Sequence, residues 1–369
     1  MLTNPPSQAP PGSVPPQDPT GDATVALVGA RPVFGLNQET LPRLVTGLAA
    51  LLPFLALIAV VLILAFKAYP AIKFNGVGFF GRTDWVPGST YANPVKTGGV
   101  LHPVGAQYGA YQLIAGTLLS SAIALFFAVP ISIGAALTIV EKLPRRASMA
   151  VGMFLETLAG IPSVVYGLWA YLTLGPVMQR DVEPPVASFF GHLPNVPILN
   201  FFRGPVASSQ GQGLITAGLV LAIMIVPIIA ATTRDLLRQV PRLPKEGALA
   251  LGMNDWEMVR KVSLPWVRSG IIGASVLGLA RALGETMAVA MIAGSALNAL
   301  PYNLYQNIGT IAATIVNQLD GSLNDGTGFT TRTLAEFALV LAVITLATNV
   351  GARLIVRRGG AVLPVGRGV

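Results

Sequence analysis

Arg281 and Glu285 are the two side chains whose types and spacing most directly indicate chemistry. They lie four positions apart in the apolar, small-residue segment RALGETMAVAMIAGSA, residues 281–296. In a continuous helix, residues four apart share one face, one turn from each other. A guanidinium offers forked donors that match the oxygens of an oxyanion, and it stays charged at any working pH. The pair predicts either an anion-binding position neutralised by its neighbour or a structural ion pair.

The composition places these two charges in a membrane protein. Of 369 residues, 53% are hydrophobic and 11% are charged, against about 25% charged in ordinary soluble domains. A charge inside a membrane span is costly, which makes Arg281 and Glu285 candidates for function. The net charge of +8 reflects the Lys and Arg that membrane proteins keep in cytoplasmic loops. With no basic run interleaved with aromatics, nucleic-acid binding is not expected.

Six apolar runs predict an all-α, polytopic membrane helix bundle in residues 41–369. The predicted spans are the run between Arg43 and Lys67, then Tyr111 to Glu141, Met149–Val177, Leu214–Thr233, Ser269–Ala293 and Leu334–Leu354. Residues 178–213 are predicted to be a loop. Between the last two spans, apolar residues recur at helical spacing over residues 308–319. That stretch is too short to cross the bilayer and predicts an interfacial or packed helix.

The distribution of Lys and Arg predicts how the bundle lies in the membrane. Most are in the N-terminal segment up to Arg43, the hairpin EKLPRRAS at 141–148, the loop 234–268 and the C-terminal residues. Because Lys and Arg accumulate on the cytoplasmic side, both termini are predicted to be cytoplasmic. The Pro-rich composition of residues 1–40 cannot bury enough apolar surface to fold, and predicts a disordered tail.

The loop 234–268 contains a predicted pair of short helices. Residues 246–251 favour a helix, and Gly252 can adopt the left-handed conformation that ends one. Asn254 and Glu257 have the spacing of a capping pair for a second helix. The two helices would form a compact unit beneath the membrane.

Leu264 and Pro265 are expected to end the second helix and turn the chain towards the fifth span. The apolar docking candidates of the unit are Ala248, Leu251, Met253, Trp256 and Val259. On these features alone, the more common interpretation of the two-helix unit is an ordinary amphipathic connector. The alternative is a docking surface for a partner.

No catalytic constellation is visible in the sequence. It contains no GxxxxGK[ST] phosphate loop, so ATP hydrolysis by that route is excluded. It has no cysteine, and its two histidines, His102 and His192, are isolated. We expect neither a metal nor a cofactor, and we do not expect the chain to be an enzyme.

Within the loop 234–268, residues 246–265 resemble the EAA loop of ABC-importer permeases. That motif reads Glu-Ala-Ala, three residues, Gly, nine residues, Ile-x-Leu-Pro. The matching residues are Glu246, Gly247, Ala248, Gly252, Val262, Leu264 and Pro265. Gly247 stands in place of alanine, and Val262 in place of isoleucine. The resemblance implies a coupling helix that docks in a groove of a cytoplasmic ATPase and transmits its ATP-driven closure.

Three further stretches, residues 116–144, 156–176 and 281–296, resemble the PstC-type permeases of bacterial phosphate importers. The resemblance covers about residues 111–357 and implies the type I ABC-importer architecture in the cytoplasmic membrane. It implies an inorganic phosphate importer that pairs with a PstA-type permease, two ATPase subunits and an extracytoplasmic phosphate-binding protein. It also favours a pathway role for Arg281, with Glu285 neutralising it when no substrate is bound.

Three other functions are weighed against this reading. An ABC permease for another oxyanion, such as sulfate or molybdate, is disfavoured by the GETMAV segment. A stand-alone secondary transporter or channel would not need an ATPase-docking motif. A membrane enzyme would need a catalytic constellation.

Several other residues in the spans have predicted structural roles. Glu156 and Glu336 are expected near helix N-termini, where the macrodipole favours anions. Gly160, Pro162 and Pro227 are expected to be kinks and close-packing points.

Overall fold

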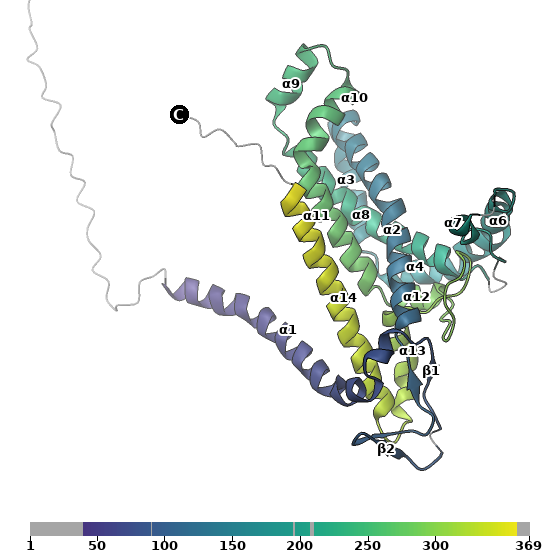
Figure 1. Ribbon diagram of the computed structural model, residues 1–369. Helices are drawn as coiled ribbons and strands as arrows, with labels where there is room; N and C mark the ends of the chain where they lie inside the picture. Colours follow the sequence, from purple (N-terminus) through teal and green to yellow (C-terminus); the bar gives the residue numbers. More distant parts are fainter. Residues whose placement is uncertain (1–39, 90, 195, 207–209, 360–369) are drawn as a thin grey trace, which may run out of the picture. The chain divides into compact units, whose positions relative to one another are not determined.

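The computed structural model describes residues 40–89, 91–194, 196–206 and 210–359, and most of these residues are helical (Figure 1). Within this part of the chain, five helices are long and apolar enough to cross a membrane, and a bent helix pair would make six. The five helices are α1 (Thr40–Asn75), α2 (Tyr111–Leu137), α8 (Leu214–Arg238), α11 (Leu264–Gly284) and α14 (Phe329–Gly359). The predicted polytopic helix bundle is confirmed. The predicted N-terminal tail, residues 1–40, lies outside the described residues except for Thr40, which is the first residue of α1.

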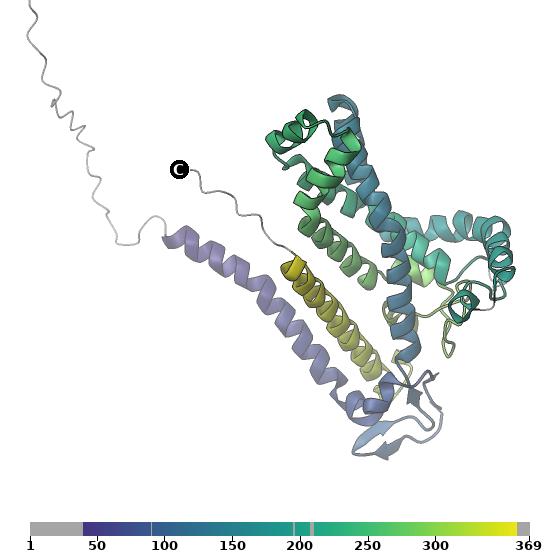
Figure 2. The same ribbon diagram turned by 45° about the horizontal axis from the view of Figure 1, so that its top comes forward.

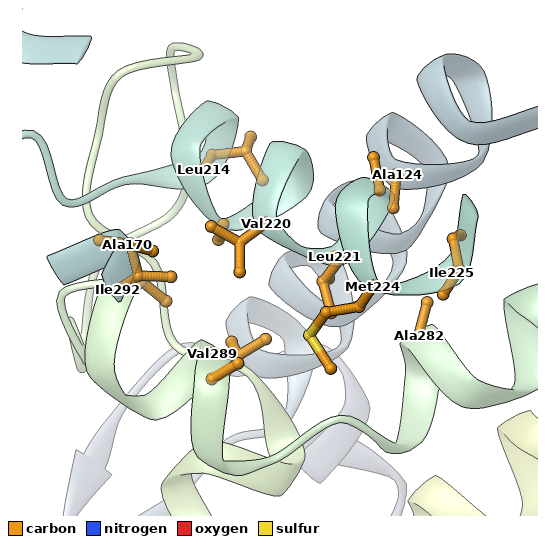
Figure 3. Packing of buried hydrophobic residues seen from close by; sticks show 14 of the residues in the cluster. Ala124, Ala170, Leu214, Val220, Leu221, Met224, Ile225, Ala282, Val289 and Ile292 are labelled. Atoms are coloured by element: carbon orange, nitrogen blue, oxygen red, sulfur yellow. The ribbon is translucent and has the colours of Figure 1, made fainter. Parts of the chain in front are cut away.

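Contacts divide the chain after Ile58, inside α1, into two units. In the second unit, from Ala59 onward, α8 is the central helix. Its most apolar window is 67% buried, against 28% for the windows of α2 and α11. Leu221 and Ile225 of α8 pack with Ala124 of α2 and Ala282 of α11 (Figure 3). Such small side chains allow helices to approach closely, which stabilises helix packing in a bilayer.

The third predicted span is a broken helix. α3 (Arg145–Ala159) and the helical run Ser163–Gly191 are bent by 89°. Pro162 has no backbone N–H and disfavours the helical conformation at Ile161, so α3 does not continue through it. The kink predicted at this position is confirmed as a complete break.

The helical run after the break extends into the segment predicted to be a loop. It contains α4 (Ser163–Trp169), α5 (Gly175–Val177) and α6 (Glu183–Gly191), joined by π-helical turns at Ala170–Leu174 and Met178–Val182. A further short helix, α7, is formed by Pro197–Asn200. The loop prediction for residues 178–213 is therefore wrong over its first part, because the prolines at the start of α6 lie in its first turn, where no intrahelical N–H is required.

Two small antiparallel sheets form at one end of the bundle. β1 (Trp85–Val86) pairs with β4 (Gln107–Tyr108), and β2 (Val95–Thr97) pairs with β3 (Val100–His102). These strands lie at the opposite end of the bundle from α9 (Arg242–Ala250) and α10 (Asp255–Met258) (Figures 1 and 2). These strands were not predicted from the sequence, where the segment is a polar loop.

The stretch between the last two spans is a packed helix, as predicted. α13 (Ile311–Leu323) packs against α14, α12 (Met287–Ile292) and α2. Its first turn is buried, and the Thr310 side chain caps it by accepting a hydrogen bond from the Ala313 N–H.

The predicted roles of Glu156 and Glu336 are wrong, because α3 and α14 begin earlier than expected. Glu156 lies in the last turn of α3 and accepts a hydrogen bond from Arg234 at 2.8 Å. Glu336 lies about two turns into α14, is buried, and accepts a hydrogen bond from the Asn75 amide at 2.7 Å. Each carboxylate therefore links its own helix to a second one: Glu156 links α3 to α8, and Glu336 links α14 to α1.

Candidate functional site

α9 and α10 form the compact two-helix unit predicted in the loop 234–268. α9 ends in a Schellman motif: the Gly252 N–H donates to the Leu249 carbonyl at 2.9 Å, and the Met253 N–H to the Ala248 carbonyl at 3.2 Å. Gly252 has φ of +81°, a left-handed conformation that costs other L-residues about 1–2 kcal/mol. The prediction that Gly252 ends the first helix is confirmed, and its geometry explains why glycine is needed there.

The second helix begins with the predicted capping box. The Glu257 N–H donates to Asn254 Oδ1 at 2.9 Å, and the Asn254 N–H donates to Glu257 Oε2 at 3.1 Å. Two backbone donors at the start of α10 are thereby satisfied. Both turns of the α9–α10 unit are therefore fixed by residues of the unit itself.

The prediction that Leu264 and Pro265 end this helix is wrong. The chain continues from α10 through a π-helical turn at Val259–Ser263 directly into α11. Pro265 lies in the first turn of α11, where the missing N–H is tolerated. The α9–α10 unit is thus joined to a membrane span by continuous helix, without a flexible hinge.

Apolar residues of the α9–α10 unit divide into an internal core and an exposed set. Ala248, Val259 and the unpredicted Met258 are each 5% exposed, with Met253 packed against them. Ala248, Met253 and Val259 therefore pack together inside the unit, and the buried Ala248 and Val259 offer little surface for docking. The exposed apolar side chains are Leu251 and Trp256, as predicted, together with Leu243 and Leu249. These four side chains are available to contact a partner.

Two ion pairs clamp the unit to the end of α2, where the helix continues as a π-helical turn over Thr138–Lys142. The Lys245 ammonium of α9 donates to Glu141 at 2.6 Å, with side chains 16% and 15% exposed. Lys142 donates to Asp255 of α10 at 2.8 Å, with side chains 62% and 65% exposed. Adjacent residues at the end of α2 thus hold one helix each of the unit. This clamp was not predicted from the sequence, although the opposite charges of Glu141 and Lys142 were its signal.

An open groove of about 670 Å³ lies between the α9–α10 unit and α2. Its lining includes Ile133 and Leu137 of α2 and Trp256 and Met258 of α10. The clamp therefore bridges two elements that are not tightly packed along their whole length.

Of the remaining motif residues, Glu246 and Gly247 lie on the exposed side of α9. A Cβ added to Gly247 would have no neighbouring atom within 4 Å. Within the described residues, Glu246 has no hydrogen-bond or ion-pair partner. Val262 is partly buried against the core of the unit. The exposed Glu246 carboxylate is thus accessible to another protein.

Arg281 and Glu285 do not lie on one helical face. α11 ends at Gly284, and Glu285 has an extended backbone with φ of −69° and ψ of 125°. The Glu285 carboxylate accepts a hydrogen bond from the Ala288 N–H at 3.4 Å, at the start of α12. No ion pair joins Arg281 to Glu285 in the described part of the chain. The predicted i, i+4 pair is wrong, because the fifth span breaks between its two members.

Arg281 instead lies in the last turn of α11 and is exposed. A cation is stabilised there by the negative end of the helix dipole. Its charge lies within electrostatic range of the Tyr166 hydroxyl of α4, which donates to the Leu158 carbonyl at 3.0 Å across the break after α3. Arg281 is thus close to both broken spans.

The two broken spans pack against each other. α12, which follows the break at Glu285, contacts α4, which follows the break at Pro162. A Cβ at Gly167 of α4 would lie 2.8 Å from the Ala288 Cα of α12, so only glycine allows this approach. Transporters commonly place substrate sites where membrane helices are interrupted. The breaks therefore mark this part of the bundle as a candidate pathway.

The described residues form a multi-span helix bundle that carries a clamped pair of short helices at one end. The family model described as binding-protein-dependent transport system inner membrane component matches residues 128–359. The chain belongs to this family, and it is a multi-pass inner membrane protein.

Individual proteins similar to this chain carry names that are more specific than the family description. The chain is 58% identical to the phosphate transport system permease protein PstC 1 of Mycobacterium tuberculosis over 328 residues, 89% of this chain and 96% of that protein. It is 39% identical to the phosphate transport system permease protein PstC of Haemophilus influenzae over 320 residues, 87% of this chain and 93% of that protein.

A solved structure of inward-facing conformations of the MetNI methionine ABC transporter is also similar, at 18% identity and a TM-score of 0.44. The match covers 68% of this chain and 94% of that one.

Proposed function

We propose that the chain is the permease subunit of an ABC transporter that imports inorganic phosphate across the cytoplasmic membrane. The observation that carries the proposal is the near full-length similarity to phosphate transport permeases, at 58% identity over 89% of the chain. The α9–α10 unit, with its fixed turns and exposed apolar side chains, supports the ATP-driven mechanism. The chain itself performs no bond chemistry, and a separate subunit hydrolyses ATP.

The α9–α10 unit is the coupling element in this proposal. Leu243, Leu251 and Trp256 offer apolar contacts to an ATPase, and Glu246 offers an unpaired charge. Movement of the docked unit reaches the membrane by two connections. One is the continuous helix from α10 into α11. The other is the clamp of ion pairs to the end of α2.

Arg281 is the proposed phosphate-contacting residue, although it is not paired with Glu285. Because Glu285 does not neutralise it in the structure, the full positive charge of Arg281 is available to an anion without first opening an ion pair. Its position at the end of α11, on the helix driven by the α9–α10 unit, links coupling to the pathway. Glu285 then has the separate role of positioning α12 through the Ala288 N–H.

The remaining parts of the proposal concern assembly and orientation. Arg281 is exposed in this single chain, as expected if the pathway is completed by a paired PstA-type permease. Two ATPases would dock on the cytoplasmic side, and an extracytoplasmic phosphate-binding protein would deliver substrate on the other. Both termini are then cytoplasmic, with the α9–α10 unit on the cytoplasmic side and the β-strands outside.

Uptake of radiolabelled phosphate at limiting concentration tests the proposal, in a deletion strain that lacks its own phosphate permeases. The strain receives this chain together with its partner subunits. We expect uptake that requires both the binding protein and an active ATPase. A Leu251→Asp, Trp256→Asp variant should reach the membrane but lose uptake. Sulfate or molybdate uptake without phosphate uptake would overturn the substrate assignment.

A further inference from the structure

A pocket of about 450 Å³ lies at the end of the bundle opposite the α9–α10 unit, and three elements build it. Tyr69, Pro70 and Lys73 come from the last turns of α1, and Arg332 comes from the first turn of α14. The hairpin β2–β3 contributes the other wall, residues Lys96 and Gly99–Leu101. Every charged side chain in this lining is a cation. The pocket therefore favours an anionic ligand, and Lys73, Lys96 and Arg332 are its three cations.

These cations are not satisfied by the protein itself. Within the described residues, none of the side chains of Lys73, Lys96 and Arg332 has a hydrogen-bond or ion-pair partner. Glu336 follows Arg332 by one turn of α14, but it is 4% exposed and its carboxylate accepts the Asn75 amide. Asp325, just before α14, is occupied by hydrogen bonds from Thr327 and Thr330. Neither acidic residue lines the pocket.

The walls of the pocket are fixed in place by an aromatic cluster beneath it. The Phe74 ring, next to Lys73, lies 4.3 Å from the His102 ring of β3 and 4.9 Å from the Phe329 ring of α14, measured between centroids. One cluster thus joins all three elements that carry the cations. The pocket is preorganised by side chains that do not themselves contact a ligand.

The hairpin that carries Lys96 has a defined two-residue turn. Gly98 and Gly99 have φ of +60° and +85°, as a type I′ turn requires. The turn sets the register in which Lys96 faces Leu101 across the strands. Lys73 Nζ lies 4.0 Å from the position that a Cβ on Gly99 would occupy. Gly99 thus lies beside Lys73, and its positive φ is the reason that the turn needs glycine there.

The surface of α1 leading to the pocket is apolar. Leu62, Phe66, Tyr69 and Lys73 recur at helical spacing and lie on one face. The first three are 52%, 78% and 65% exposed. From Leu62 to Lys73 the helix rises about 16 Å, close to half of the roughly 30 Å hydrocarbon thickness. The face therefore changes from apolar, through an aromatic ring of the kind found at membrane interfaces, to basic.

We propose that this pocket binds the headgroup phosphate of an anionic phospholipid, whose acyl chains lie along the exposed face of α1. The headgroup oxygens take the hydrogen bonds that Lys73, Lys96 and Arg332 do not make within the protein. The apolar approach over Phe66 distinguishes a lipid from a free phosphate ion, which would gain nothing from it. A bound lipid would join α1, the hairpin β2–β3 and α14 at a second point, besides the aromatic cluster.

Native mass spectrometry of the assembled transporter, titrated with defined phospholipids, tests this proposal. Phosphatidylglycerol should bind more tightly than phosphatidylcholine of the same acyl chains, and its affinity should fall as salt is raised. Replacing Lys73, Lys96 and Arg332 by Gln should weaken phosphatidylglycerol binding about fivefold per charge, or about a hundredfold together. The matched control is Lys67→Gln, on another face of α1 and outside the pocket, which should leave affinity unchanged.

Two further probes separate the lipid from a free anion. Phe66→Ser should weaken binding of long-chain phosphatidylglycerol but not of soluble glycerol phosphate. Millimolar inorganic phosphate should not displace phosphatidylglycerol; displacement would assign the pocket to the free ion and overturn the lipid. Equal affinity for the two phospholipids, or an equal loss in Lys67→Gln, would also overturn the proposal. Because the readout is lipid binding, it is independent of whether the chain transports phosphate.

Discussion

Lys245→Gln is expected to loosen the α9–α10 unit from α2 far more than Lys142→Gln does. The Lys245–Glu141 pair is 2.6 Å long, with side chains 16% and 15% exposed. A charge-assisted hydrogen bond in such a site contributes about 1.5–3 kcal/mol. The Lys142–Asp255 pair is 62% and 65% exposed, so its contribution is about 0–1 kcal/mol. If the substitution removes about 2 kcal/mol of this interaction, the population in which the unit is detached from α2 rises about thirtyfold.

Hydrogen exchange of the α9 and α10 backbone amides, measured in the assembled transporter, reports this opening directly. Lys245→Gln should raise their exchange rates about thirtyfold, and Lys142→Gln no more than about fivefold. A charge swap, Glu141→Lys with Lys245→Glu, should restore most of the protection. Equal acceleration by the two single variants would refute the reasoning, since burial would then not set the strength of the clamp. A swap no better than Lys245→Gln would likewise exclude a direct pair.

Three further outcomes follow from the geometry. Arg281→Gln should abolish phosphate uptake while the complex still assembles, as checked by co-purification of the subunits; normal uptake would contradict its pathway role. Gly247→Ala should leave thermal stability unchanged or raise it by up to about 1 kcal/mol, whereas Gly252→Ala should lower it by about 1–2 kcal/mol; similar values would contradict the assigned backbone roles. Burial acts to raise the pKa of Asp325, but hydrogen bonds from Thr327 and Thr330 outweigh it and hold the pKa below its usual value. Asp325 therefore stabilises the fold above its unfolded pKa, and this contribution is lost as the pH falls through the folded pKa. Asp325→Asn should lower thermal stability near neutral pH, and the difference from the unaltered chain should shrink in acid; a constant difference would contradict the charge-based account.

The sequence predicted those features that depend on local chemistry. Gly252 and the Asn254–Glu257 pair act through neighbouring backbone groups, so spacing alone was sufficient to place both turns of the α9–α10 unit. The membrane spans were also recognisable, because a bilayer demands long apolar runs. Their ends were less accurate, since α8 and α14 extend beyond their apolar centres into polar residues.

Features that depend on tertiary contacts were not predictable in the same way. The i, i+4 reasoning for Arg281 and Glu285 assumed an unbroken helix, and no proline between them signalled the break. The packing of α12 on α4 is a contact distant in sequence, as is the bond between Arg234 and Glu156. The clamp of Lys245 to Glu141 also joins residues far apart in the chain, and pairing such charges requires knowledge of the fold.

Because both turns of the α9–α10 unit are fixed by its own hydrogen bonds, its shape does not depend on contact with a partner. A surface segment that orders only on contact must lose conformational entropy at that moment, which weakens its affinity. Here the Schellman motif, the capping box and the core around Ala248 already hold the backbone in one shape. A partner therefore meets a rigid shape and can bind it without an accompanying folding step. Substitutions that loosen either turn should weaken docking even when every exposed side chain is retained.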